Sequence, residues 1–182
     1  MKKVYVITCK TGTILSHIIK WLTGEPYPHC SISLDKSLYR MYSFGRRTPY
    51  DVFNAGLVHE RPDKNIFARF PKTTCSIYEI DVTNEQYVTI WNNIKEFWQH
   101  KEKYHFNHPG IVAAWVNLYP DIPDFYYCSQ FVGCMLEKAG VKYSEKPFRQ
   151  VRSVDFRESS VTRKIYEGNL LEYWNSVKRP ED

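Results

Sequence analysis

The sequence predicts a fold that mixes β-strands and α-helices in one domain. Polar and apolar residues alternate over residues 29–34 and 74–82, which is typical of strands with one buried face. Apolar residues recur at helical spacing over 88–98 and 131–139, which predicts two longer helices. Prolines, glycines and polar turn residues separate these segments, so strands and helices follow one another along the chain.

The composition is that of a folded protein. The chain has 182 residues, of which 43% are hydrophobic and 16% aromatic, enough to bury a core and to exclude a disordered chain. We expect one domain over residues 1–182, with a charged C-terminal extension over about 160–182. The net charge of +5 comes from scattered basic residues, so no nucleic-acid partner is expected.

The lengths of the apolar runs and the spacing of the cysteines indicate in which cellular compartment the protein is expected. No apolar run is long enough to cross a bilayer, and the run 4–7 is too short for the core of a signal peptide. The five cysteines form no Cys-x-x-Cys pair, which argues against a disulfide scaffold or a zinc ribbon. A cytoplasmic protein is therefore expected. The cysteines expected to be small buried residues are Cys9, Cys30, Cys75 and Cys134.

Five strands and one short helix are expected before residue 83. The helix covers residues 14–22, where five apolar residues follow helical spacing. Residues 35–37 form a polar turn, and the segment 45–73 is rich in residues that favour loops. The expected strands cover residues 4–8, 29–34, 38–44, 57–60 and 74–82.

Helices dominate the rest of the prediction. Thr83 has the character of a helix cap, because Glu85 and Gln86 follow it and apolar residues then recur to Trp98. A linker and a further helix are expected over 104–119.

The next helix begins near a cysteine. Pro120, Pro123 and a candidate cap, Asp124, precede it, and Gly140 ends it. Cys128 lies one turn before an apolar stripe, so its thiol belongs to the buried face of the first turn. Unpaired N–H groups and the helix dipole stabilise a thiolate there, which makes this cysteine a candidate nucleophile. The alternative is a small apolar filler.

The predicted hairpin places a histidine on a polar strand face. If Leu34 and Leu38 close a three-residue loop, His29 lies opposite Ser43, within hydrogen-bonding distance. A loop one residue shorter or longer would put Tyr42 or Phe44 there instead. Cysteine catalysis needs an imidazole base and a polar group that orients it, and the two come from distant parts of a sequence. The alternative for this histidine is a structural, hydrogen-bonded role.

The segment Tyr127-Cys128-Ser129-Gln130-Phe131-Val132 resembles the Cys-Ser-x-Phe-Val signature of NlpC-type papain-like cysteine peptidases. Here His29-Cys30-Ser31-Ile32 comes before the cysteine, which is similar to the circularly permuted branch, the YiiX-like and lecithin:retinol-acyltransferase-like proteins. The resemblance implies an α+β domain in which an antiparallel sheet carries the cysteine helix. It also implies an oxyanion hole that includes the backbone N–H of Cys128.

The resemblance implies a hydrolase with Cys128 as nucleophile, His29 as general base and Ser43 as third polar residue. Many relatives have a carboxylate, an amide or a second histidine at the third place, and a serine stabilises imidazolium less well. Amide, ester or thioester bonds of small peptides or lipid acyl groups are the expected substrates, and no cofactor is needed. The alternatives are a non-catalytic binding module and a lipid acyltransferase or phospholipase.

Aromatic residues near the cysteine are candidates for a substrate groove, although such residues more often belong to a core. His105 and His108 are three residues apart, but no neighbouring carboxylate or cysteine completes a metal site, so none is expected. The groove candidates are Tyr119, Tyr126 and Tyr127, with Trp115 and Phe125 nearby in the sequence.

Overall fold

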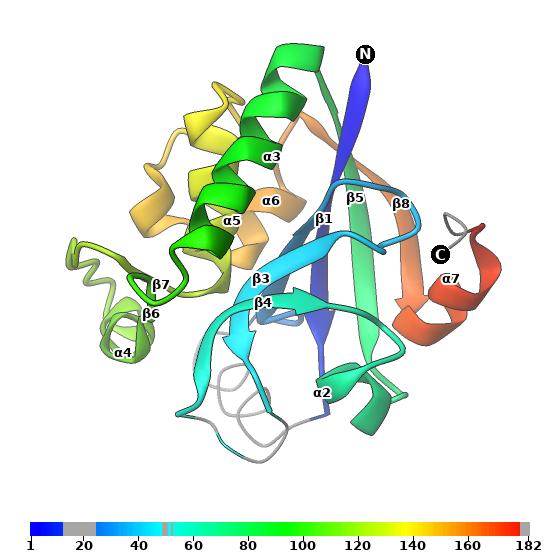
Figure 1. Ribbon diagram of the computed structural model, residues 1–182, viewed down its shortest axis with the longest axis horizontal. Coiled ribbons are helices and arrows are strands. Elements are labelled where there is room, and N and C mark those ends of the chain that lie inside the picture. Colours follow the sequence, from blue (N-terminus) through cyan, green and yellow to red (C-terminus); the bar gives the residue numbers. More distant parts are fainter. Residues whose placement is uncertain (13–24, 49–50, 52, 179–182) are drawn as a thin grey trace.

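A six-stranded antiparallel sheet lies at the centre of the computed structural model, which describes residues 1–12, 25–48, 51 and 53–178 (Figure 1). The strand order is β4-β3-β2-β1-β5-β8. The strands are β1 (Lys2–Lys10), β2 (His29–Ser33), β3 (Met41–Arg46), β4 (Ala55–Glu60), β5 (Thr74–Val82) and β8 (Thr162–Asn169).

Helices cover both faces of the sheet. Figure 1 shows α3, α5 and α6 on one side and α7 on the other. A short parallel pair, β6 (His105–Phe106) and β7 (Phe125–Tyr126), lies outside the main sheet. The helices are α2 (Asn65–Arg69), α3 (Asn84–Gln99), α4 (His108–Trp115), α5 (Cys128–Lys138), α6 (Ser153–Arg157) and α7 (Leu170–Ser176), with a 3₁₀ turn, η1 (Phe148–Gln150).

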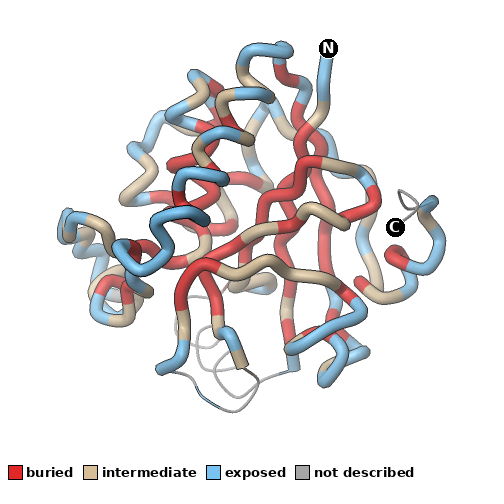
Figure 2. The backbone as a smooth tube through the Cα atoms, in the orientation of Figure 1, coloured by how far each residue is buried: buried red, intermediate tan, exposed pale blue. Residues whose placement is uncertain are grey.

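Two apolar cores lie on the two faces, because strand side chains alternate between them. On the first face, Cys30, Ile32 and Phe44 of the sheet pack with Phe131 and Met135 of α5. On the second face, residues of β1, β3 and β5 pack with α2 and α7. Figure 2 shows the buried backbone concentrated in the central strands. The helix that begins at Cys128 therefore packs against an antiparallel sheet, as expected for the α+β domain.

Most predicted elements are confirmed. The strand Thr74–Val82 has the predicted bounds, and α3 begins after Thr83, whose side chain accepts a hydrogen bond from the Gln86 amide at 3.1 Å. The strand predicted over 57–60 lies within β4, and α4 lies within the segment 104–119. The helix α2 was not predicted, and the helix predicted over 14–22 lies outside the described residues.

The predicted C-terminal extension over about 160–182 is wrong. Residues Thr162–Asn169 pair with β5 as the edge strand β8, and α7 follows directly. Leu170 and Trp174 are each only 1% exposed in the second core. The segment has a polar composition because the exposed face of β8 carries charged residues. Its backbone nevertheless pairs with β5.

Gly133 gives a stability prediction, because it lies where α5 passes closely under the segment 143–151. A β-carbon there would collide with the Tyr143 hydroxyl and lie 2.8 Å from Val151 Cγ2. Glycine to alanine in a helix normally stabilises by about 1 kcal/mol, but overpacking of a core costs about 1–3 kcal/mol. We expect Gly133→Ala to lower the free energy of unfolding, measured by urea titration. An unchanged or higher midpoint would show that this contact is not tight.

Candidate active site

The helix α5 begins at Cys128, and buried polar bonds hold its first turn. Gln130 is 1% exposed, and its Oε1 accepts hydrogen bonds from the Tyr127 backbone N–H at 3.2 Å and from Asn107 Nδ2 at 3.3 Å. Its Nε2 donates to the Arg149 carbonyl at 3.0 Å. These bonds fix the position of the thiol relative to α4 and η1. The structure thus confirms the predicted helix with Cys128 in its first turn.

The predicted cap, Asp124, is wrong. The residue at the N-cap position of α5 is Tyr127, and Asp124 lies before the short strand β7 with a positive φ of 62°. The prolines therefore precede a turn and a strand rather than the helix itself.

The fold brings Cys128 and His29 together. His29 is the first residue of β2, and the Cys128 thiol donates to the carbonyl of the preceding residue, Pro28, at 3.8 Å. The Cys128 thiol is also near enough to the His29 side chain to raise the pKa of the imidazole. Two residues that are about a hundred positions apart in the sequence thus meet where α5 and β2 begin.

A third residue, Glu60, completes this arrangement. Its Oε1 lies 2.9 Å from His29 Nε2, and its Oε2 accepts a hydrogen bond from Ser31 Oγ at 2.5 Å. The two side chains are largely shielded, with 22% of His29 and 11% of Glu60 exposed. Because Nε2 is bound to the carboxylate, Nδ1 is the ring nitrogen left for the thiol. The order thiol, imidazole, carboxylate is the order that a catalytic triad requires.

The carboxylate and the thiol determine the charge of the imidazole. Burial by itself would lower the pKa of His29, because it disfavours the charged ring. The charge of Glu60 and hydrogen bonds with Cys128 and Glu60 outweigh burial and raise the pKa of His29 to about 10. His29 is therefore an imidazolium at neutral pH, and an imidazolium stabilises a neighbouring thiolate.

The predicted pairing of His29 with Ser43 is wrong, because the hairpin has a longer loop. Ser33 pairs with Met41, and the Leu34 backbone N–H donates to the Arg40 carbonyl at 3.1 Å. This register puts Gly45 opposite His29, and a β-carbon there would lie 3.4 Å from the imidazole Cε1.

Asp35 explains the longer loop. Its carboxylate accepts hydrogen bonds from the backbone N–H groups of Tyr39 at 3.1 Å and Arg40 at 2.9 Å, and from the Ser37 hydroxyl. Leu38, predicted to begin the strand, instead lies in the turn with a φ of 61°. The sequence identifies Asp35 as a turn residue, but its type does not show that its carboxylate closes a five-residue loop.

Glu60 reaches His29 because β3, the strand between them, carries a glycine beside both side chains. A β-carbon on Gly45 would lie 3.4 Å from His29 Cε1 and 3.5 Å from Glu60 Oε1. The Ser31 hydroxyl of β2 then binds the other oxygen of the carboxylate. The sequence signal that could have found Glu60 is a carboxylate at the end of a strand whose neighbours carry serine.

Ser43 has a structural hydrogen bond, which gives a second prediction. Its Oγ is buried and donates to the Cys30 carbonyl at 2.6 Å. We expect Ser43→Ala to cost about 1 kcal/mol of stability and to leave the NMR titration of His29 unchanged. If Ser43→Ala instead lowered the pKa of His29 as much as a Glu60 variant does, Ser43 would have to be counted among the residues that act on the imidazole.

The three candidate groove tyrosines differ in their surroundings. Tyr126 is a core residue, 7% exposed and packed against Phe44 and Phe97, so its predicted place in a groove is wrong. Tyr127 is buried, and its hydroxyl has no hydrogen-bond partner among the described residues. Burial raises the pKa of Tyr127, and the nearby groups of Cys128 and Tyr119 raise it further. Tyr119 itself is half-buried.

Within the described residues, the other candidates have no comparable arrangement. Cys9, Cys30, Cys75 and Cys134 are buried, as predicted. In the part of the chain that the structure describes, no three metal-ligating side chains gather around one point. None of the described helices is both long and apolar enough to span a membrane.

The sequence matches no known family model, and no curated protein is similar enough to count as a relative.

Proposed function

We propose that the protein is a cysteine hydrolase with a circularly permuted papain-like fold. The observation that carries this proposal is the position of His29: its Nε2 lies 2.9 Å from Glu60 Oε1, the Cys128 thiol contacts the carbonyl of the residue before it, and the thiol helps to raise the pKa of its imidazole. Two features support the proposal: a histidine with a raised pKa next to the thiol, and a carboxylate that holds its ring.

The residues act in a defined order. The Cys128 sulfur attacks the carbonyl carbon of an amide, ester or thioester, and the carbon–sulfur bond forms while the carbonyl oxygen gains charge. The bond from the carbonyl carbon to the leaving amine, alcohol or thiol then breaks, His29 gives its proton to that leaving group, and Glu60 keeps the ring in place. Water then attacks the acyl-enzyme, gives a proton back to His29 and releases the acid.

The start of α5 supports stabilisation of the oxyanion. Cys128 is the first residue of this helix, and the first N–H groups of a helix have no intrahelical acceptor. The backbone N–H of Cys128 is therefore a donor next to the sulfur that forms the acyl bond.

The test is a screen of chromogenic acyl esters, thioesters and peptide amides with the wild-type protein and Cys128→Ala. The hydrolase proposal requires turnover of at least one class, lost in the variant, and a covalent acyl adduct at Cys128 detected by mass spectrometry. An inert wild-type protein whose Cys128 reacts with iodoacetamide no faster than a free thiol would favour a non-catalytic binding module.

One observation favours a lipid-acting version of this enzyme. The α4 segment, which precedes Cys128 in the chain, exposes Val112, Val116 and Leu118 by 55%, 66% and 62%. Exposed apolar side chains of this kind suit contact with an acyl-chain aggregate. Turnover of an ester should then increase when the ester forms micelles, and Val116→Ser should reduce that increase. Val88→Ser on α3, where the valine is 53% exposed, is the matched control.

A further inference from the structure

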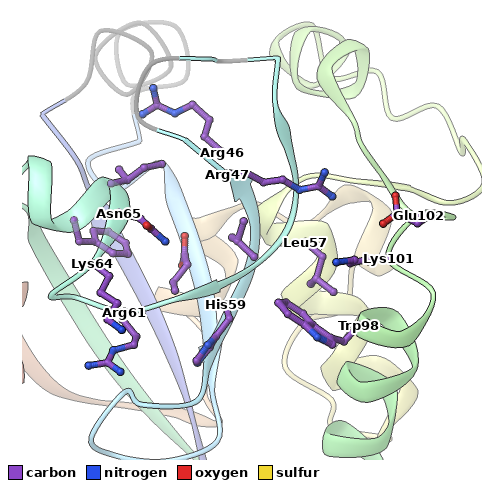
Figure 3. Close-up of a pocket in the computed structure, with 14 residues that line it drawn as sticks. Arg46, Arg47, Leu57, His59, Arg61, Lys64, Asn65, Trp98, Lys101 and Glu102 are labelled. Atoms are coloured by element: carbon purple, nitrogen blue, oxygen red, sulfur yellow. The ribbon is translucent and has the colours of Figure 1, made fainter.

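The carboxylate of the proposed triad has open space beside it. Glu60 is the last residue of the edge strand β4, and it lines a cavity with a volume of about 330 Å³. Basic side chains, among them Arg61 and Lys64, also line this cavity, and Figure 3 shows both on one side of it. A glutamate side chain has several rotatable bonds, so its position beside His29 needs a second contact to fix it.

Ser31 supplies that contact. Its Oγ donates a hydrogen bond to Glu60 Oε2 at 2.5 Å, while Glu60 Oε1 lies 2.9 Å from His29 Nε2. The two oxygens of the carboxylate are thus bound by two side chains of β2 that are two residues apart. A contact at each oxygen fixes the plane of the carboxylate, and hydrogen bonds to an ionised group are stronger than those between neutral groups.

The strand that carries Ser31 is a firm support for this contact. β2 lies between β1 and β3 in the sheet, and Ser31 pairs with Ile7 of β1. A serine hydroxyl is placed by a single side-chain torsion, so the backbone of β2 determines where it lies. Ser31 is also 0% exposed. It therefore does not touch a substrate, and any effect on the reaction has to pass through other residues.

The hydrogen-bond distances indicate through which residue Ser31 acts. Its Oγ also lies 3.4 Å from His29 Nε2, but a hydroxyl has only one proton to donate. The contact with Glu60 is the shorter one, so the proton belongs to that bond. Glu60 and Cys128 are the groups whose contacts raise the pKa of His29. Ser31 thus influences the imidazole through the carboxylate.

We propose that Ser31 is a positioning residue that holds the Glu60 carboxylate on the imidazole of His29. Without the hydroxyl, Glu60 Oε2 loses its donor, and the side chain turns toward the cavity, where water and basic side chains bind it. The imidazole then loses part of the charge that stabilises its protonated form. The contribution of Ser31 to catalysis rests on the proposed hydrolase function, whereas its effect on His29 does not.

The first test is an NMR titration of His29 in Ser31→Ala. The pKa of the imidazole should fall by about one unit, because a contacting opposite charge shifts a pKa by about 1–3 units and only part of that charge moves away. The matched control is Ser33→Ala. Ser33 lies two residues further along the same face of β2, is also 0% exposed, and donates to the Asp35 carbonyl at 2.9 Å. This variant should leave the His29 titration unchanged.

The second test separates an effect through Glu60 from a direct effect on the ring. Ser31→Ala and Glu60→Gln are combined, and the pKa of His29 is measured in the single and the double variants. Ser31→Ala should lower this pKa in the wild-type background and leave it unchanged in the Glu60→Gln background. If Ser31→Ala does not fold, Ser31→Cys, whose thiol is a weaker donor, gives the same comparison.

Two results would overturn the proposal. One is that Ser31→Ala lowers the pKa of His29 no more than Ser33→Ala does. The other is an equal fall in the wild-type and Glu60→Gln backgrounds, which would show that the hydroxyl acts on the ring itself. Neither titration needs a substrate. An inert wild-type protein would therefore refute the hydrolase proposal alone, whereas turnover with an unchanged titration in Ser31→Ala would refute the role of Ser31 alone.

Discussion

Glu60→Gln is expected to slow the reaction of Cys128 with iodoacetamide at pH 7 by up to about fourfold, because an ordinary imidazole is about one quarter protonated at that pH. An opposite charge next to a titratable group shifts its pKa by about 1–3 units, and the amide removes that charge while keeping the shape. The pKa of His29 should therefore fall from about 10 toward its ordinary value of 6.5. At neutral pH less imidazolium then remains to stabilise the thiolate.

The same substitution changes how stability depends on pH. Because the folded-state pKa of His29 lies above 6.5, its contribution to stability is complete below pH 6.5 and is lost as the pH rises toward about 10. In Glu60→Gln the loss should be smaller and should occur at lower pH. Urea unfolding at pH 6 and at pH 9.5, compared between the two proteins, measures this difference.

The control for Glu60→Gln is Glu102→Gln, which removes a carboxylate from the neighbouring cavity and leaves His29 untouched. If Glu60→Gln reacted with iodoacetamide at the wild-type rate and the NMR titration of His29 were unchanged, the Glu60 carboxylate would have no effect on the imidazole or the thiol. The proposed triad would then consist of the thiol and the imidazole alone.

Local sequence patterns predicted most of the elements, but not how the strands pair. The alternation around His29 identified its strand and its polar face, because both depend on the nearest neighbours in the sequence. The partner of His29 depended on the loop around Asp35, where hydrogen bonds between carboxylate and backbone extended the loop. A change of two residues in the register moved Ser43 away from the ring and left Glu60 to bind it.

The same limit explains the error at the C-terminus. The segment that forms β8 is an edge strand, and its exposed face carries charged residues such as Arg163 and Lys164. A polar composition cannot distinguish an exposed edge strand from a free tail, because the difference lies in backbone pairing with β5. The Cys128 helix, in contrast, was predictable because its apolar stripe and its terminating glycine are local signals.

Gln130→Leu is expected to destabilise the protein by about 3 kcal/mol or more and to slow alkylation of Cys128. Leucine has a similar size but leaves the Tyr127 N–H, the Asn107 amide and the Arg149 carbonyl without their partner. Each buried polar group without a hydrogen bond costs about 1–3 kcal/mol. The first turn of α5 should shift to recover these bonds, and the thiol should move with it.

Gln86→Leu is the matched control, because both glutamines accept the N–H of the residue that caps their helix. Gln86 accepts from Thr83 at 3.0 Å, but this bond is exposed, so water replaces it and the cost should stay below about 1 kcal/mol. Urea unfolding and the iodoacetamide rate are measured for both variants. If Gln130→Leu loses stability but reacts at the wild-type rate, the buried bonds hold the helix without positioning the sulfur. Equal stability losses in the two variants would instead show that burial at Gln130 adds nothing to an ordinary helix cap.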